Sequence, residues 1–302
     1  MGMIENLVSI DNMYDAWDSV QANHGGPGVD QVTITRWARN WEENIERLRD
    51  QIVAKTYYPT RPRRIQISTS NGKIREISIL TVTDRVAQRA FLNIVEPHFE
   101  QRFLGCSHAY RKGRSTSTAV QQVVSYRDQG YQYVLDADVK ACFDNIDHTI
   151  LLEKFKRVIK DPGAVDLINQ WLQSGRKHRH QAKGLPQGAV ISPLLCNVYL
   201  HALDAKVLCG RWKFIRYADD FIAMTQSFEQ AQTITSLVSG WLGELRLTFN
   251  NFKTSITTFE EGFSFLGVYF LRDRISYTSH NKTVELSGRK LKNLYRFPPS
   301  FY

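Results

Sequence analysis

The sequence predicts an α+β fold built from antiparallel hairpins and amphipathic helices. The dipeptide Asn71-Gly72 lies between two runs of alternating apolar and polar residues, which is typical of a tight hairpin. Residues 213–224 form a second strand-turn-strand pattern, interrupted at its centre by Asp219 and Asp220. Apolar residues recur at helical spacing in other stretches, for example in residues 41–55. Hairpins and helices therefore share one chain.

Composition favours a globular protein that binds a polyanion. The chain has 302 residues, of which 42% are hydrophobic and 23% are charged, and its formal net charge is +9. This charge favours nucleic acid over an anionic membrane surface, because no basic amphipathic helix stands out. No apolar run approaches the roughly 18 residues of a membrane span, and the N-terminus does not resemble a signal peptide. The four scattered cysteines predict reduced thiols and a cytoplasmic protein.

The first part of the chain combines helices with a basic hairpin. Residues 1–56 are expected to be helical, apart from a glycine-rich loop at 24–30 that is either a linker or a close approach to a partner. Residues 57–82 then form the hairpin around Asn71-Gly72. Such a hairpin is either merely solvated or holds a triphosphate or a template strand. Its basic residues are Arg61, Arg63, Arg64, Lys73 and Arg75.

Two further basic stretches border predicted helices. Thr83 is expected to cap a helix whose apolar face opposes Arg85. Arg111, Lys112 and Arg114 surround a glycine just before a helix that begins near residue 116. Cations and free main-chain N–H groups at a helix start favour a phosphate site, and a solvated loop is the alternative.

The acidic residues predict a metal site. Asp219 and Asp220 lie side by side between apolar strands, where a hard divalent cation would relieve their repulsion. The alternative is an ordinary turn, since Asp is common in turns. The strand over residues 133–138 ends in Asp136 and Asp138 on one face. A carboxylate there could face the pair and complete a two-metal phosphoryl-transfer site.

Three later stretches carry further candidates. Residues 184–193 contain Gln187, with donors and acceptors, beside Gly188, where a base pair could approach the main chain. Lys253 precedes a predicted strand, and residues 263–268 are expected to form a tight apolar strand.

Taken in order, these motifs resemble the reverse transcriptases, specifically the bacterial group II intron-like branch. The resemblance runs from about Gly25 to Gly267. Its motifs are RRIQISTSNGKIREI, TVTDRVAQRAF, VEPHFEQRF, YRKGRS, LDADVKACFDNIDH, GLPQGAVISPLLCNVYLHALD, RYADDF, Lys253 and FLG. The fold implied is a right-hand polymerase with an antiparallel palm, helical fingers and a short or reduced thumb.

The resemblance also implies roles for individual residues. Asp138, Asp219 and Asp220 would bind two Mg²⁺ ions, with Mn²⁺ as a substitute, and Lys253 would approach the leaving pyrophosphate. Phe143 would be the steric gate that excludes a 2′-hydroxyl. The remaining roles would be triphosphate binding by Lys73 and Arg75, nucleotide binding by Gln187 and Gly188, and primer grip by Phe265, Leu266 and Gly267.

The implied protein is an RNA-directed DNA polymerase that binds an RNA template, a DNA or RNA primer and deoxynucleotides. The short stretch after Gly267 favours a compact stand-alone enzyme that copies a dedicated non-coding RNA in anti-phage defence. The alternatives are a catalytically idle RNA-binding scaffold and a maturase-like splicing factor. The expected parts are an N-terminal helical extension (1–56), fingers (57–130), a palm (131–270, with a fingers insertion at about 149–183) and a basic thumb or tail (271–302).

Overall fold

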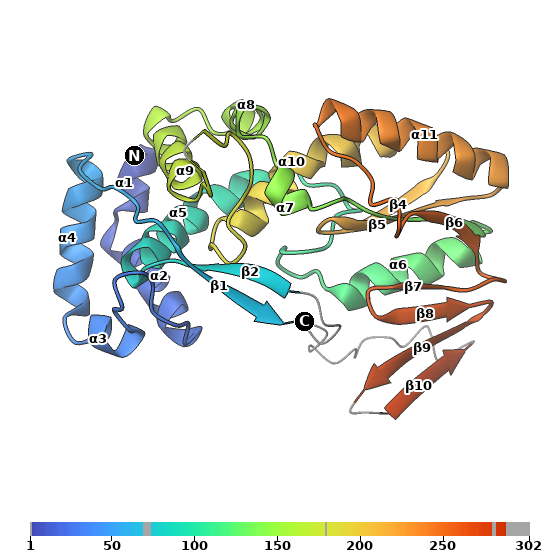
Figure 1. Cartoon of the computed structure of the whole chain (residues 1–302), viewed down its shortest axis with the longest axis horizontal. Helices are drawn as coiled ribbons and strands as arrows, with labels where there is room; N and C mark the ends of the chain where they lie inside the picture. The colour runs from blue at the N-terminus through green and yellow to red at the C-terminus, as the bar shows by residue number, and fades with distance from the viewer. Residues whose placement is uncertain (1, 69–73, 179, 280–281, 288–302) are drawn as a thin grey trace. The chain divides into compact units, whose positions relative to one another are not determined.

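A computed structural model describes residues 2–68, 74–178, 180–279 and 282–287 (Figure 1). The chain forms two compact units, each made of two separate segments. Unit 1 comprises Met1–Arg102 and Phe143–Tyr199, and unit 2 comprises Phe103–Cys142 and Leu200–Tyr302. Helices and antiparallel strands occur together, which confirms the α+β prediction.

Unit 1 is mainly helical, and its long helix α5 (Val82–Glu100) packs against the N-terminal helices. Asn12 donates from its side chain to the Ala90 carbonyl of α5 (3.0 Å), which joins two segments distant in the chain. The cap of α5 is Thr81, whose hydroxyl accepts from the Asp84 N–H, so the predicted cap Thr83 lies inside the first turn. The N-terminal helices are α1 (Met3–Leu7), α2 (Ile10–Ala22), α3 (Ile34–Ala38) and α4 (Trp41–Val53).

The basic hairpin consists of β1 (Arg63–Ser68) and β2 (Ile74–Ile79), paired from Arg63↔Ile79 to Ser68↔Ile74. This register confirms the antiparallel hairpin. The Asn-Gly turn and Lys73 lie outside the described residues.

The second segment of unit 1 adds short, well-capped helices. Asp147 accepts from the N–H groups of Thr149 and Ile150, which starts α8. Asp161 caps the next helix, which has Pro162 at its first position, where no N–H donor is needed. The helices are α7 (Cys142–Asn145), α8 (His148–Val158), α9 (Pro162–Ser174) and the start of α10 (Ser192–Val207).

Unit 2 is organised around a four-stranded antiparallel sheet in the order β4-β5-β3-β6. Helix α11 packs on β3 and β5, and α6 packs on β4, so Figure 1 shows the sheet between the two helices. Because helices cover both faces of the sheet, every residue of β5 from Phe221 to Thr225 is buried. The elements are α6 (Thr116–Asp128), β3 (Tyr133–Asp138), β4 (Lys213–Tyr217), β5 (Asp220–Thr225), α11 (Phe228–Glu244) and β6 (Ser255–Thr258).

A second sheet in unit 2 has the order β10-β9-β8-β7. The predicted strand over residues 263–268 is in fact a hairpin, because Leu266 and Gly267 both adopt positive φ (53° and 74°) and Phe265 pairs with Val268. The sheet continues past residue 271 through β9 and β10. The strands are β7 (Phe263–Phe265), β8 (Val268–Leu271), β9 (Arg274–Ser279) and β10 (Lys282–Ser287).

The described helices include none that is both long and apolar enough to cross a membrane. The four-part division of the chain stays a prediction. Packing and side-chain hydrogen bonds, such as the one from Trp37 Nε1 to Thr83 Oγ1 (3.1 Å), join the N-terminal helices to α5 within unit 1.

A buried histidine in unit 2 predicts a loss of stability in mild acid. The ring nitrogens of His108 face Thr118 Oγ1 (2.8 Å) and Gln122 Oε1 (2.7 Å), and burial lowers the pKa of His108 to about 4. Because the unfolded chain takes up this proton near pH 6.5, the free energy of unfolding should fall by about 2 kcal/mol between pH 7.5 and pH 5.

Denaturant unfolding at both pH values checks this expectation, with His108→Gln as the control that lacks the titrating group. The loss should be smaller in the variant by about 2 kcal/mol. Equal pH dependence in the two proteins would contradict it. The positive charges of Arg114, Arg111 and Arg216 lower the pKa of His108 further, because they repel a proton on its ring.

Candidate active site

The predicted carboxylates come together at one end of the main sheet of unit 2. Asp138 ends β3 and lies directly opposite Asp220, the first residue of β5. Asp219 occupies the β4–β5 turn, where its carbonyl accepts from the Val139 N–H (3.2 Å). Ala218 precedes it with φ of 58°, which gives the turn its sharp reversal.

The charges in this cluster act on one another. Burial, and after it the neighbouring charges of Asp136, Asp138 and Asp219, together raise the pKa of Asp220 to about 7. Burial also raises the pKa of Asp136 to about 6. Asp136 is therefore part of the cluster, although the sequence analysis assigned it no role. Its alternation with Asp138 along β3 was the available clue.

One loop after α11 supplies the groups that face Asp138. Lys253 Nζ lies 3.3 Å from Asp138 Oδ2, and the Asn250 side chain donates to the same oxygen at 2.9 Å. The Asn250 N–H also donates to the main-chain carbonyl of Asp138 at 2.8 Å. Lys253 thus lies beside one of the predicted carboxylates, whereas Asn250 was not among the predicted site residues. It is separated from Asp138 by 112 positions, and no local pattern marks such a contact.

A fully buried ion pair lies behind the turn. The Arg216 guanidinium donates to both carboxylate oxygens of Asp204, at 2.7 and 2.6 Å. It also donates to the Ala218 carbonyl (2.9 Å) and to the Ser107 hydroxyl (2.8 Å). One cation therefore connects α10, the loop before α6 and the turn that carries Asp219.

In unit 1 the predicted nucleotide residues are brought together around β2. The Leu185 N–H donates to the Phe143 carbonyl (2.7 Å), and the Ser78 N–H donates to the Gln187 carbonyl (2.7 Å). Gly188 is exposed with φ of 101°. Phe143, Gln187 and Gly188 thus share one region with the hairpin. Arg75 is exposed on that hairpin.

The arginines of unit 1 hold the chain as well as presenting charge. Arg63 Nε donates to the Pro27 carbonyl (3.0 Å), and Arg85 Nη2 donates to the Gly26 carbonyl (2.9 Å). Both therefore fasten the glycine-rich loop. Arg64 Nη2 donates to the Gly175 carbonyl (3.0 Å), and Arg61 is exposed.

The basic loop before α6 shows a similar use of its cations. Arg111 is only 8% exposed and donates to the carbonyls of Leu104 and Ser107 (2.7 Å each). This burial is at odds with the predicted phosphate contact of Arg111, because its charge faces the interior of the unit. Arg114 donates to the Gly105 carbonyl (2.8 Å), and Lys112 is exposed.

The predicted primer grip presents main chain rather than side chains. Phe265 and Leu266 are buried in the apolar core between α6 and the second sheet, whereas Gly267 is exposed. The tip of the β7–β8 hairpin therefore offers a contact through its main chain.

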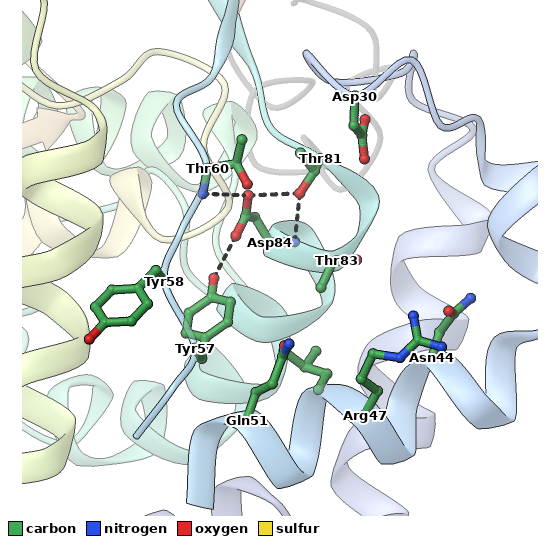
Figure 2. Close-up of a pocket in the computed structure, with 11 residues that line it drawn as sticks. Asp30, Asn44, Arg47, Gln51, Tyr57, Tyr58, Thr60, Thr81, Thr83 and Asp84 are labelled. Atoms are coloured by element: carbon green, nitrogen blue, oxygen red, sulfur yellow. Dashed lines mark hydrogen bonds between the residues drawn. The ribbon is translucent and has the colours of Figure 1, made fainter. Parts of the chain in front are cut away.

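A polar cavity of about 270 Å³ lies in unit 1 between α4 and the start of α5. Figure 2 shows Asp84 on its wall, accepting from the Tyr57 hydroxyl (2.6 Å), the Thr81 hydroxyl (2.7 Å) and the Thr60 N–H (3.2 Å). None of the predicted site residues lines this cavity. The hydrogen bonds of Asp84 hold residues 57–60, which lead into the hairpin, against α5.

The described part of the chain contains no group of three or more His, Cys, Asp and Glu side chains already arranged to hold a metal ion. The chemistry of the donor set nevertheless fits a hard cation. Only oxygen ligands converge, and their mutual repulsion is what a divalent ion would relieve.

Comparison with known proteins identifies the family. Residues 65–270 match the family described as "Reverse transcriptase (RNA-dependent DNA polymerase)". Protein YkfC of Escherichia coli is 30% identical over 88% of this chain and 81% of its own length. The group II intron-encoded protein LtrA of Lactococcus lactis is 34% identical over 72% of this chain, but over only 37% of its own length.

Among solved structures, telomerase from Candida albicans has a TM-score of 0.57 and 13% identity, and the match covers 82% of this chain and 50% of that one. This likeness supports the right-hand polymerase fold. The sequence relatives agree with the group II intron-like resemblance that the motifs predicted. The chain therefore belongs to the reverse transcriptase (RNA-dependent DNA polymerase) family, in its group II intron-like branch.

Proposed function

We propose that the carboxylate cluster of unit 2 is the centre at which this RNA-directed DNA polymerase joins nucleotides. The opposed register of Asp138 and Asp220 supports this proposal, because it draws one carboxylate from each of two neighbouring strands to a single point. The raised pKa of Asp220 points the same way, since buried acids held among like charges are typical of functional sites.

Asp138, Asp219 and Asp220 would hold two Mg²⁺ ions, or Mn²⁺ in their place. When bound, such ions supply charge stabilisation for an attacking and a leaving oxygen. Lys253 would take part by facing the leaving pyrophosphate. Its ammonium group already balances Asp138 and remains 52% exposed, so it is accessible to an anion. Asn250 would fix the orientation of the Asp138 carboxylate through its side-chain hydrogen bond.

The nucleotide would be bound by groups of unit 1. Arg75 and Lys73 on the hairpin would face the triphosphate, and Gln187 with Gly188 would lie against the nucleotide and its base pair. Phe143 would exclude a 2′-hydroxyl. The support is that the loop over residues 185–187 is bonded through its main chain to Phe143 at one end and to Ser78 of β2 at the other.

The template and primer would meet exposed main chain and exposed cations. The tip at Gly267 is available to a primer, and Arg61 and Lys112 are available to phosphates. The motif resemblance supports a role in anti-phage defence, in which the enzyme would copy a dedicated non-coding RNA. Because the chain spans about a third of LtrA, the activities of that whole protein do not carry over.

A primer-extension assay distinguishes a polymerase from a catalytically idle RNA-binding scaffold. Purified protein should extend a DNA or RNA primer on an RNA template when deoxynucleotides and Mg²⁺ are supplied. An RNA-binding scaffold or splicing factor would bind the same RNA and add nothing. Exchanging the RNA template for DNA, and deoxynucleotides for ribonucleotides, then defines the preferred substrates.

Phe143→Ala should weaken the choice of sugar. Removing the ring would open the space that a 2′-hydroxyl needs, so ribonucleotide addition should rise relative to deoxynucleotide addition by about 10- to 100-fold. The ratio of kcat/KM for the two nucleotides measures this effect. Phe228→Ala, at an exposed position of α11, is the control and should leave the ratio unchanged. An unchanged ratio in Phe143→Ala would remove the gate assignment.

A further inference from the structure

Strand β2 is bonded by its main chain to the loop that carries Gln187 and Gly188. The N–H of buried Ser78 donates to the Gln187 carbonyl at 2.7 Å. A Cβ atom on Gly188 would lie 2.7 Å from the Ser78 carbonyl oxygen, and the φ of Gly188 is 101°. Glycine therefore permits this close approach, and the inner half of β2 is fixed against the loop.

The outer half of β2 makes a different contact, through side chains. Glu76 lies two residues before Ser78 and so on the same face of the strand. Its Oε1 atom is 3.1 Å from Lys177 Nζ and 3.6 Å from Arg64 Nε. Lys177 Nζ is also 3.3 Å from Asp144 Oδ1. One ammonium group thus joins two carboxylates that come from β2 and α7.

Helix α7 is held by hydrogen bonds of its own. The Leu185 N–H donates to the Phe143 carbonyl (2.7 Å), and Lys183 donates to the Asn145 side chain (2.9 Å). These bonds hold α7 to the segment after residue 180 without Lys177. Among the described residues of the outer half of the hairpin, which carries Arg75, no main-chain hydrogen bond leads to another segment, and two strands alone are only marginally stable.

We infer that Lys177 is a positioning residue, which bridges Glu76 and Asp144 and so keeps the hairpin that carries Arg75 in a fixed relation to α7 and Phe143. This inference rests on the proposed nucleotide site. The bridge would hold the triphosphate contact and the sugar contact at a constant spacing before the nucleotide arrives. Such preorganisation lowers the entropy lost on binding.

Lys177→Met should raise the KM for deoxynucleotides by about three- to tenfold, because two partly exposed ion pairs together contribute on this scale. Because Lys177 touches no reacting group, kcat should change by less than about twofold. Lys177→Arg keeps the charge and should restore most of the affinity. Lys183→Met is the matched control: it removes a lysine that is bonded to α7 in the same segment and makes no hydrogen bond or ion pair with the described residues of the hairpin.

Hydrogen exchange supplies a readout that does not depend on activity. The amides of residues 74–77 should exchange faster in Lys177→Met than in the wild type or in Lys183→Met. Unchanged exchange together with an unchanged KM would overturn the inference while leaving the proposed polymerase function intact. If the wild type adds no nucleotide, the proposed function fails, and the exchange comparison alone then decides whether the bridge orders the hairpin.

Discussion

Replacing Asp219 and Asp220 together by asparagine should reduce primer extension at least about a thousandfold. The two changes keep the shape of the turn and remove the negative charge that would bind divalent cations. The folded protein should not lose stability, because burial and like charges already disfavour the ionised form of Asp220. Initial rates of deoxynucleotide addition and a thermal melt of the same preparation measure the two effects. RNA binding should persist.

Asp136→Asn is the matched control for this experiment. Asp136 lies in the same cluster and on the same strand as Asp138, yet it is not one of the proposed metal ligands. Its replacement should lower the rate by no more than about tenfold, as expected for a more distant charge. If the double variant still extends a primer at a rate near that of the wild type, the assignment of the catalytic centre is wrong.

The second large effect concerns stability. Arg216→Met should lower the free energy of unfolding by about 3–5 kcal/mol, because it leaves the fully buried Asp204 carboxylate without its cation. The loss is a large fraction of the roughly 5–15 kcal/mol that stabilises a typical domain, so the variant should be poorly soluble at 37 °C. Denaturant unfolding at 25 °C measures it.

A second variant separates stability from positioning. Asp204→Leu combined with Arg216→Met removes both charges, and apolar replacements of buried pairs often restore stability. DNA synthesis should nevertheless stay impaired, because the Ala218 carbonyl beside Asp219 has lost the donor at 2.9 Å. Full activity in the stable double variant would show that Arg216 serves only the core. If Arg216→Met alone is as stable as the wild type, the argument that it leaves a buried charge without its partner is wrong.

The sequence predicted those parts of the site that depend on local order. Alternation and turn chemistry predicted an Asp219-Asp220 turn and Asp138 at a strand end. The structure has Asp219 in the turn and Asp220 at the start of β5, opposite Asp138. Asn250 and Asp204 were not predicted, because each acts through a partner that lies far away along the chain or on a different element.

The basic residues illustrate another limit of the sequence. Charge density drew attention to the hairpin and to the loop before α6, but it does not distinguish a cation that faces solvent from one that donates to a main-chain carbonyl. Arg111 and Lys112 are neighbours in the chain, and yet one is buried and the other exposed. That difference arises from the path of the loop around Leu104 and Ser107, which no local pattern specifies.

The reversal at Leu266 and Gly267 has a consequence for what can be copied. The Leu266 side chain is buried, and the exposed atoms at this reversal are peptide groups, which are common to every residue. In the proposed primer contact, a strand passing this point would be sensed by the geometry of its sugars and phosphates. Such a contact is indifferent to base identity, so a growing end of any composition could advance past it.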